Sequence, residues 1–474
     1  MSQLDLAIVL AAGEGKRMRS KHPKVLHEIC GAPLISHVLE AIRALETKKN
    51  LVVLGDKREA VTNWLAQNQN QVETVVQEEQ LGTGHAVKVA LESQKQKTGK
   101  VLIVPADMPL ITPEDLSNLF SAAQDTAGAV LIAEVLNPSG YGRVKAQDSK
   151  VLAIIEDKDA DEETLRINEI NTGIYIFDIS LLSEALKALK PENQQKEFYL
   201  TDVVEILNKQ GHSIASAKCL HAESALGVND RQQLAEASLI MQKRINSFWL
   251  SSGVSMRNPE TVFIDRTASL SSDCFLDNNT FVLGKSQVAE GVSLGPDVTL
   301  VDCKIGENAK IISSTLIEAE VGEAAAVGPY TYLRPGAKLA KGSKVGAYVE
   351  VKNSSIGEGA KVPHLSYIGD GIVGKESNIG AGTIFANYDG EEKHQTVVGE
   401  FVKIGSDNVL VAPVTIGDGA YTAAGSVIVE DVEPGAMGVA RGKQKNVLGW
   451  VKRKRPNSKA AKAAERAQNY DPDK

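Results

Sequence analysis

The second half of the chain carries a short repeat in which an aliphatic residue is followed directly by glycine. Between residues 283 and 417 the pair recurs thirteen times, and within blocks the spacing is a multiple of six residues. A six-residue period is typical of a hexapeptide β-helix, in which each turn stacks on the next and buries the aliphatic position. A glycine-rich β-sandwich is the alternative. The aliphatic members are Leu283, Leu294, Ile305, Val321, Val327, Val345, Ile356, Ile368, Val373, Ile379, Val398, Ile404 and Ile416.

The largest gap in this repeat lies between Gly380 and Val398 and contains the polar sequence NYDGEEKHQ. Insertions in repeat proteins collect on one face, and surface loops often carry function, so we expect a functional insertion here. Beyond Arg441 the chain becomes basic and alanine-rich. We interpret this segment as an arm-like tail.

The first half of the chain has a different rhythm, in which β-rich runs alternate with helical patterns. This alternation predicts βαβ units around a mainly parallel sheet, with ligands at the carboxyl ends of the strands. A single long helical pattern then links the halves, with Asn229 or Asp230 as its cap and Gly253 at its end. The expected strands are 51–55, 72–77, 101–107 and 129–136, and the expected helices are 32–45 and 84–94.

These patterns predict an α/β N-terminal domain of Rossmann-like character followed by an all-β, left-handed parallel β-helix. The expected boundaries are a first domain at 1–229, a linker helix at 230–252, a β-helix domain at 253–442 and the tail at 443–474. A chain of 474 residues is long enough for two or three domains.

The composition of the chain bears on its ligand class and on the compartment in which it works. The net charge of −8 argues against a dedicated nucleic-acid binder. Four scattered cysteines without a C-x-x-C pair fit neither a zinc site nor a disulfide framework, so we expect a cytoplasmic protein. No apolar stretch is long enough to predict a membrane span.

The segment LAAGEGKRMRSKHPK, residues 10–24, directly follows the apolar run at 7–9. It is not a Walker A loop, because the glycine spacing is wrong and no Ser or Thr follows Lys16. It also lacks the third glycine of a dinucleotide fingerprint. A Gly-x-Gly turn after a strand still exposes backbone N–H groups to a phosphate, and Arg17 and Lys24 add positive charge. On spacing alone, an ordinary basic turn is an equal alternative.

Further motifs decide between these readings. LAAGEGKRM with Pro23-Lys24 is similar to the signature of sugar-phosphate nucleotidyltransferases. QEEQLGTGHA (77–86), SGYGR (139–143), EINTG (169–173) and GVN (227–229) extend the match, and YLRPGA (332–337), HLSYIGD (364–370), NIGAGT (378–383), NYDG (387–390) and LVAPVTIG (410–417) continue it. Together they resemble the bacterial bifunctional N-acetylglucosamine-1-phosphate uridyltransferase/glucosamine-1-phosphate acetyltransferase family.

The resemblance implies a first reaction site in the α/β half. In that family a sugar-1-phosphate attacks the α-phosphate of UTP, and Lys24 and Arg17 would offset charge on the leaving pyrophosphate. Asp107 and Asn229 would hold Mg²⁺, although Pro-Ala-Asp stands where Tyr-Gly-Asp or similar is expected. The implied UDP-N-acetylglucosamine contacts are Leu10, Ala11, Ala12, Gly13, Lys24, Gln77, Gly82, Thr83, Asp107, Gly142, Glu156, Asn171 and Asn229.

The resemblance also implies an acetyl-transfer site in the repeats. His364 would take a proton from the amine of glucosamine-1-phosphate, and histidine suits that task near neutral pH. The sugar phosphate would lie against Arg334, Lys352, Tyr367 and Asn378. Acetyl-coenzyme A would contact Ala381, Asn387, Tyr388, Ser406, Ala424 and Arg441, with the Ser406 hydroxyl or a nearby amide facing the oxyanion.

Related hexapeptide acyltransferases work as trimers, so the resemblance implies a homotrimer acting on small molecules and supplying precursors of peptidoglycan and lipopolysaccharide. Two alternatives remain: a nucleotidyltransferase whose β-helix only mediates oligomerisation, and a non-catalytic sensor of sugar nucleotides. The set His364, Tyr367, Asn387 and Tyr388 argues against the first, because a purely structural helix has no need of it. Lys24, Asp107 and Asn229 argue against the second.

Overall fold

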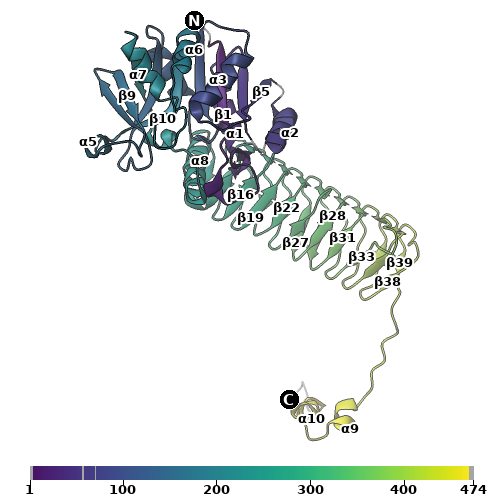
Figure 1. The fold of residues 1–474 in the computed structure, drawn as a ribbon. Helices are drawn as coiled ribbons and strands as arrows, with labels where there is room; N and C mark the ends of the chain where they lie inside the picture. The colour runs from purple at the N-terminus through teal and green to yellow at the C-terminus, as the bar shows by residue number, and fades with distance from the viewer. Residues whose placement is uncertain (1–3, 56–57, 70, 469–474) are drawn as a thin grey trace. The chain divides into compact units, whose positions relative to one another are not determined.

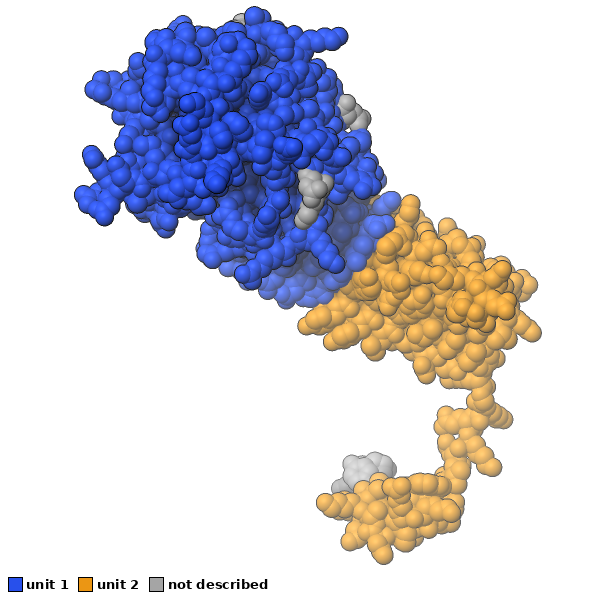
Figure 2. Space-filling model, in the orientation of Figure 1, with its two compact units in different colours: residues 1–324 blue, residues 325–474 orange. Residues whose placement is uncertain are grey.

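The computed structural model describes residues 4–55, 58–69 and 71–468. The chain divides into two compact units, residues 1–324 and 325–474 (Figure 2). The last part of the expected tail, residues 469–474, lies outside the described residues.

Unit 1 is built around a nine-stranded sheet with the strand order β5-β4-β1-β6-β10-β7-β11-β9-β8 (Figure 1). The neighbours β5, β4, β1 and β6 are mutually parallel, and β10 runs antiparallel to both β6 and β7. The strands are β1 (Leu6–Ala11), β4 (Asn50–Leu54), β5 (Val72–Val76), β6 (Lys100–Pro105), β7 (Gly128–Glu134), β8 (Arg143–Gln147), β9 (Lys150–Ile155), β10 (Glu169–Asp178) and β11 (Ile214–Lys218). All four expected strands are therefore present.

Both faces of this sheet are buried. On β1, Ala7 and Val9 face one apolar cluster, whereas Leu6 and Ile8 face another. A strand that is covered on both sides reads as a continuous apolar run, which is why the pattern was recognisable. The helices of unit 1 are α1 (Leu34–Arg43), α2 (Arg58–Asn68), α3 (Thr83–Ser93), α4 (Pro113–Ala122), α5 (Glu162–Leu165), α6 (Ile179–Lys187), α7 (Asp202–Lys209) and α8 (Arg231–Ser251), with the 3₁₀ turns η1 (Lys16–Met18), η2 (Lys24–Leu26) and η3 (Ala222–Ala225) and a short β2 (Glu28–Ile29)–β3 (Ala32–Pro33) pair.

Helix α8 occupies the position of the expected linker. Asp230 caps it by accepting a hydrogen bond from the Gln233 amide, and Gly253 follows its end with φ +92°. Its buried contacts toward the first coils are polar: the Asn246 amide donates to the carbonyls of Pro259 (2.8 Å) and Val262 (2.9 Å). These bonds tie the helix to the start of the repeats within unit 1.

Arg266 of the first coils makes a buried polar contact with His37 of the α/β half of unit 1. On α1, His37 is 5% exposed, and its Nε2 lies 3.1 Å from the carbonyl oxygen of Ile29 and 3.2 Å from that of Ala32. Because carbonyls only accept, Nε2 carries the proton, and Nδ1 accepts from the Arg266 guanidinium at 3.2 Å. Burial first, and then Arg266, lower the pKa of His37 to about 4 from its usual 6.5.

This histidine makes stability depend on pH. Since its folded-state pKa is lowered, its contribution is present above about pH 6.5 and is lost as the pH falls toward 4. Chemical unfolding at pH 7.0 and 4.5 should show that the wild type loses about 2 kcal/mol more than His37→Gln. The control is His221→Gln, because His221 is exposed. Equal losses in wild type and His37→Gln would contradict this assignment.

The repeats of unit 1 form parallel coils. Three sheets of short strands run along the coils, and their strands in this unit have the orders β12-β15-β18-β21, β13-β16-β19-β22 and β14-β17-β20-β23. The strands are β12 (Ser255–Met256), β13 (Val262–Ile264), β14 (Ser269–Leu270), β15 (Phe275–Leu276), β16 (Thr280–Leu283), β17 (Gln287–Val288), β18 (Ser293–Leu294), β19 (Val298–Val301), β20 (Lys304–Ile305), β21 (Lys310–Ile311), β22 (Thr315–Ile317) and β23 (Glu320–Val321), with η4 (Pro259–Thr261).

Unit 2 continues the same coil pattern. Its strands are β24 (Ala326–Val327), β25 (Tyr332–Leu333), β26 (Lys338–Leu339), β27 (Lys344–Ala347), β28 (Glu350–Lys352), β29 (Ser355–Ile356), β30 (Lys361–His364), β31 (Tyr367–Gly369), β32 (Gly371–Val373), β33 (Ile384–Ala386), β34 (Thr396–Val398), β35 (Val409–Val411), β36 (Val414–Ile416), β37 (Tyr421–Thr422), β38 (Val427–Ile428) and β39 (Met437–Gly438). In the tail, α9 (Trp450–Lys454) and α10 (Lys459–Gln468) follow.

The register explains the six-residue period. Lys344 pairs with Lys361, seventeen positions on, which is close to three hexapeptides. Twelve of the thirteen aliphatic repeat residues are buried, and Leu283 is partly buried. Gly371 instead pairs with Thr396, twenty-five positions on, so the expected insertion does leave the coil here. The β-helix prediction is confirmed.

All four cysteines are free. No helix in the described part of the chain combines the length and apolar character that crossing a bilayer requires.

Candidate functional site

In unit 1, a cavity of about 410 Å³ lies at the carboxyl ends of β1, β5 and β6. The strands β5, β4, β1 and β6 end at this edge, which is where ligands bind in open α/β sheets. Nine residues implied by the resemblance line the cavity together. They are Leu10, Ala11, Ala12, Gly13, Lys24, Gln77, Gly82, Thr83 and Asp107.

Three residues from distant parts of the sequence meet at the inner edge of this cavity. The Lys24 ammonium pairs with the Asp107 carboxylate and donates to Asn229 Oδ1 at 2.8 Å. Asp107 follows β6, and the Val228 amide donates to its carbonyl at 2.8 Å, which brings Asn229 alongside. The two oxygen donors already surround a cation. A carboxylate and an amide oxygen are also suitable ligands for Mg²⁺, which usually takes only one or two protein ligands.

The side chains at this site are too few to coordinate a metal ion by themselves. Among the described residues, no group of three or more His, Cys, Asp or Glu side chains could hold a metal ion. The pair Asp107 and Asn229 therefore fits an ion that takes its remaining ligands from phosphate and water.

Gln77 lies in the wall of the cavity and is only 4% exposed. Its Nε2 donates to the Gly82 carbonyl at 3.2 Å and lies 3.0 Å from His85 Nδ1. These contacts fix the amide, so its oxygen can face a base. His85 and Gln80, whose Nε2 donates to the Ala12 carbonyl at 2.8 Å, were not foreseen from the sequence.

The sugar-side residues also come together. The Asn171 amide donates to the Gly142 carbonyl at 2.8 Å, and a Cβ on Gly142 would lie 3.5 Å from Glu156 Oε2. Burial raises the pKa of the Glu156 carboxyl. Asn171 Nδ2 donates to the Tyr175 hydroxyl at 2.7 Å. Pro105 belongs to the Pro-Ala-Asp segment that differs from the family pattern. It packs against Gly173, because a Cβ added to Gly173 would lie 3.2 Å from Pro105 Cγ.

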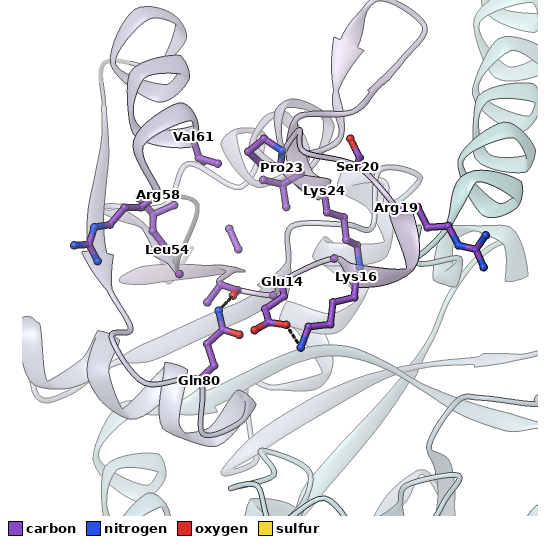
Figure 3. Close-up of a pocket in the computed structure, with 16 residues that line it drawn as sticks. Glu14, Lys16, Arg19, Ser20, Pro23, Lys24, Leu54, Arg58, Val61 and Gln80 are labelled. Atoms are coloured by element: carbon purple, nitrogen blue, oxygen red, sulfur yellow. Dashed lines mark hydrogen bonds and ion pairs between the residues drawn. The ribbon is translucent and has the colours of Figure 1, made fainter.

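A second cavity of about 410 Å³ (Figure 3) adjoins the first along the glycine-rich loop, and the residues that line both are Ala11, Ala12, Gly13, Glu14, Lys24, Val25 and Gln80. It adds the cations Lys16, Arg19 and Arg58, of which Lys16 is paired with Glu14 and Arg58 with Glu78. Arg17 is exposed on η1 and lines neither cavity. Of the two arginines near the loop, Arg19 contributes to the lining of the second cavity, and its guanidinium extends away from the other labelled lining residues (Figure 3).

In unit 2, His364 ends strand β30 and its side chain is exposed. Its carbonyl accepts from the Gly382 amide, the Ala381 carbonyl accepts from Asp407, and the Ser406 carbonyl accepts from Gly425, so residues of successive coils stand above one another. Arg441 Nη1 completes the series by donating to the Ala424 carbonyl at 2.9 Å. We term this set the His364 column, and it comprises His364, Ala381, Ser406, Ala424 and Arg441.

A cationic cluster lies on the neighbouring sheet of unit 2. Arg334 Nη1 donates to Glu350 Oε1 at 2.8 Å, and Lys352 Nζ lies 3.9 Å from Asp370 Oδ2. Lys393, from the insertion, contacts Lys352 and is the main reason that the pKa of Lys352 is lowered. A site in which two ammonium groups are crowded together favours a bound anion. Lys393 was not foreseen.

Two residues expected to bind coenzyme A, Asn387 and Tyr388, lie in the insertion and have different surroundings. Asn387 is 7% exposed, and its Nδ2 donates to Asp370, which places it in the cationic cluster. Tyr388 is exposed, and its hydroxyl donates to the Gly390 carbonyl. The expected sugar-phosphate residues also divide: Tyr367 stacks above Glu350 in register, whereas Asn378 takes the position one coil beyond Lys361.

Comparison with known proteins covers both halves. The family described as MobA-like NTP transferase domain matches residues 7–165, and the family described as GMPPB C-terminal domain matches residues 316–418. A solved structure of UDP-glucose pyrophosphorylase complexed with UDP-glucose is 19% identical, with a TM-score of 0.42, and the match covers 51% of this chain and 100% of that one.

Full-length relatives are more similar. The "Bifunctional protein GlmU" of Streptomyces avermitilis is 49% identical over 463 residues, which cover 97% of this chain and 96% of the relative. The protein of the same name from Streptomyces coelicolor is 48% identical over 97% of this chain and 96% of the relative. That of Corynebacterium glutamicum is 43% identical over 98% of this chain and 97% of the relative. With such identity over nearly its whole length, this chain belongs to the family of bifunctional GlmU proteins.

Proposed function

We propose that the chain makes UDP-N-acetylglucosamine in two steps, at two sites. It first transfers an acetyl group from acetyl-coenzyme A to the amine of glucosamine-1-phosphate, and then transfers uridylate from UTP to the product. The observation that carries this proposal is that each unit brings a different chemical set together. Lys24, Asp107 and Asn229 meet in unit 1, whereas unit 2 carries the exposed His364 on β30 and a cationic cluster on the neighbouring sheet.

In the uridylyl step, the phosphate of N-acetylglucosamine-1-phosphate attacks the α-phosphorus of UTP and pyrophosphate leaves. Asp107 and Asn229 would hold Mg²⁺, which when bound neutralises phosphate charge. Lys24 binds phosphate oxygens of the same nucleotide from within the cavity, and Arg17 would reach them from its exposed position on η1. The reaction needs little covalent chemistry from the protein, so charge and positioning supply most of the acceleration.

The cavity residues orient the two substrates for this attack. Gln77, with the backbone at 10–13 and 82–83, contacts the uridine, and the absence of a Cβ at Gly82 allows close approach. Gly142, Glu156 and Asn171 hold the sugar hydroxyls and the N-acetyl group.

In the acetyl step, the amine nitrogen of glucosamine-1-phosphate attacks the thioester carbonyl carbon. His364 takes the proton that the nitrogen loses, the C–S bond breaks, and the imidazolium returns the proton to the sulfur, so that coenzyme A leaves as a thiol. The Ser406 hydroxyl or a nearby backbone N–H donates to the oxyanion. The column above His364 gives the coenzyme a continuous track, with Tyr388 of the insertion beside it.

The cationic cluster binds the sugar phosphate. We expect Lys393→Ala to raise the KM for glucosamine-1-phosphate about tenfold, because one charge-assisted contact to the phosphate is lost. The KM for acetyl-coenzyme A should stay the same. Steady-state release of coenzyme A at varied concentrations of each substrate measures both, and Lys375→Ala, an exposed lysine of unit 2 paired with Glu358, is the control. A rise in the KM for acetyl-coenzyme A alone would contradict this role.

A homotrimer is supported by exposed aromatic and aliphatic side chains beside His364. Tyr330 and Tyr348 stack with ring centroids 5.3 Å apart and are each 61% exposed, and Leu365 on the next coil is 60% exposed. Such a column of apolar side chains is suited to burial against a second copy. Neighbouring copies would then enclose the exposed His364.

The functional boundaries that we propose are 1–229 for uridylyl transfer, 230–252 for the linker, 253–442 for acetyl transfer and 443–474 for the basic tail. Four free cysteines support work in the reducing cytoplasm.

The test is a paired assay of the wild-type protein. Glucosamine-1-phosphate with acetyl-coenzyme A should release coenzyme A, and N-acetylglucosamine-1-phosphate with UTP and Mg²⁺ should release pyrophosphate. Pyrophosphate alone would support the alternative, a nucleotidyltransferase with a non-catalytic β-helix. If neither coenzyme A nor pyrophosphate is released, both the proposal and this alternative are contradicted.

A further inference from the structure

The Lys24 ammonium occupies the place between the two side chains that we propose as metal ligands. It pairs with Asp107 and donates to Asn229 Oδ1 at 2.8 Å, and the side chains of Lys24 and Asp107 are only 12% and 22% exposed. An ammonium held between the same two side chains repels a divalent ion that approaches them. The lysine head must therefore leave before a metal can bind there.

The stem of Lys24 lies against the glycine-rich loop. Gly15 has φ +64°, and a Cβ added to it would lie 2.7 Å from the Cβ of Lys24. The absence of a side chain at Gly15 leaves this space to the Lys24 stem. Lys24 lines both cavities beside the glycine-rich loop, so its head can exchange Asp107 for an anion within reach.

We infer that Lys24 is an internal counter-ion that keeps the metal site closed until the phosphates of a nucleotide take up its ammonium. This inference rests on the proposed function of the site. It makes nucleotide and metal binding cooperative, because the nucleotide removes the charge that opposes the metal. By thermodynamic linkage, the metal strengthens nucleotide binding by the same factor.

The test is a titration of the full-length protein with Mn²⁺ in the absence of any nucleotide. The electron paramagnetic resonance signal of the free ion measures how much Mn²⁺ is bound. Lys24→Gln should bind Mn²⁺ about tenfold more tightly than the wild type, because the competing ammonium is gone. Lys21→Gln is the matched control: it removes one exposed lysine three positions away, outside both cavities, and should leave the affinity unchanged. Lys24→Met is the second variant if Lys24→Gln does not fold.

A double variant separates this inference from the proposed metal site. Lys24→Gln with Asp107→Asn should lose the tight Mn²⁺ site. If Lys24→Gln binds no more tightly than the wild type, the counter-ion role is wrong, while Mg²⁺-dependent uridylyl transfer by the wild type still stands. If the double variant keeps the tight site, the ion does not bind at Asp107, and both the inference and the proposed ligand set are wrong.

Discussion

Replacing His364 with alanine should lower acetyl transfer by about 10²–10⁴-fold, the usual contribution of a positioned general base. His364 is the one histidine of the His364 column, and no other side chain of that column could replace it as a base near neutral pH. Release of coenzyme A measures the loss. Pyrophosphate release from UTP and N-acetylglucosamine-1-phosphate should stay within about twofold of wild type, because additivity holds for independent sites.

The control for this variant lies on the same strand. Lys361 is exposed at the start of β30, and Lys361→Ala removes a polar side chain without touching the column. It should keep acetyl transfer near the wild-type rate. If His364→Ala keeps full acetyl transfer, the base lies elsewhere, and the proposed mechanism is wrong.

Replacing Asp107 with asparagine should produce the reverse pattern. The variant keeps the size of the side chain but removes its charge, which leaves the Lys24 ammonium without its ion pair. Loss of a metal ligand and disorder of a phosphate-binding lysine together should lower uridylyl transfer by about 10³-fold or more. Pyrophosphate release measures this loss, and coenzyme A release should be unaffected.

The matched control is Asp125→Asn, which neutralises an exposed carboxylate in the same unit. It should leave both reactions near their wild-type rates. If Asp107→Asn, still folded by thermal unfolding, silenced acetyl transfer as well, the two reactions would share a site, which contradicts the proposal.

Much of the architecture was predictable because it follows from local periodicity. Val345 and Ile368 mark buried coil positions since each hexapeptide places one aliphatic side chain inside. The buried run at 101–104 read as a strand for a similar reason, because it is covered on both faces. The antiparallel strand β10 was not predicted, since strand direction depends on pairing between distant segments.

The site was predictable where a residue follows a strand or belongs to a recognisable motif. Asp107 and Asn229 are of this kind, although only folding shows that both contact Lys24. Lys393 was missed because a lysine in a polar insertion looks like any solvated charge.

The central claim is that one chain carries two independent sites, and mixing two inactive variants tests it directly. Neither His364→Ala nor Asp107→Asn alone should convert glucosamine-1-phosphate, acetyl-coenzyme A and UTP into UDP-N-acetylglucosamine. An equimolar mixture should form it, because released N-acetylglucosamine-1-phosphate passes from one variant to the other. If the mixture stays inactive while each variant keeps its remaining half-reaction, the two sites do not act independently, and the account is contradicted.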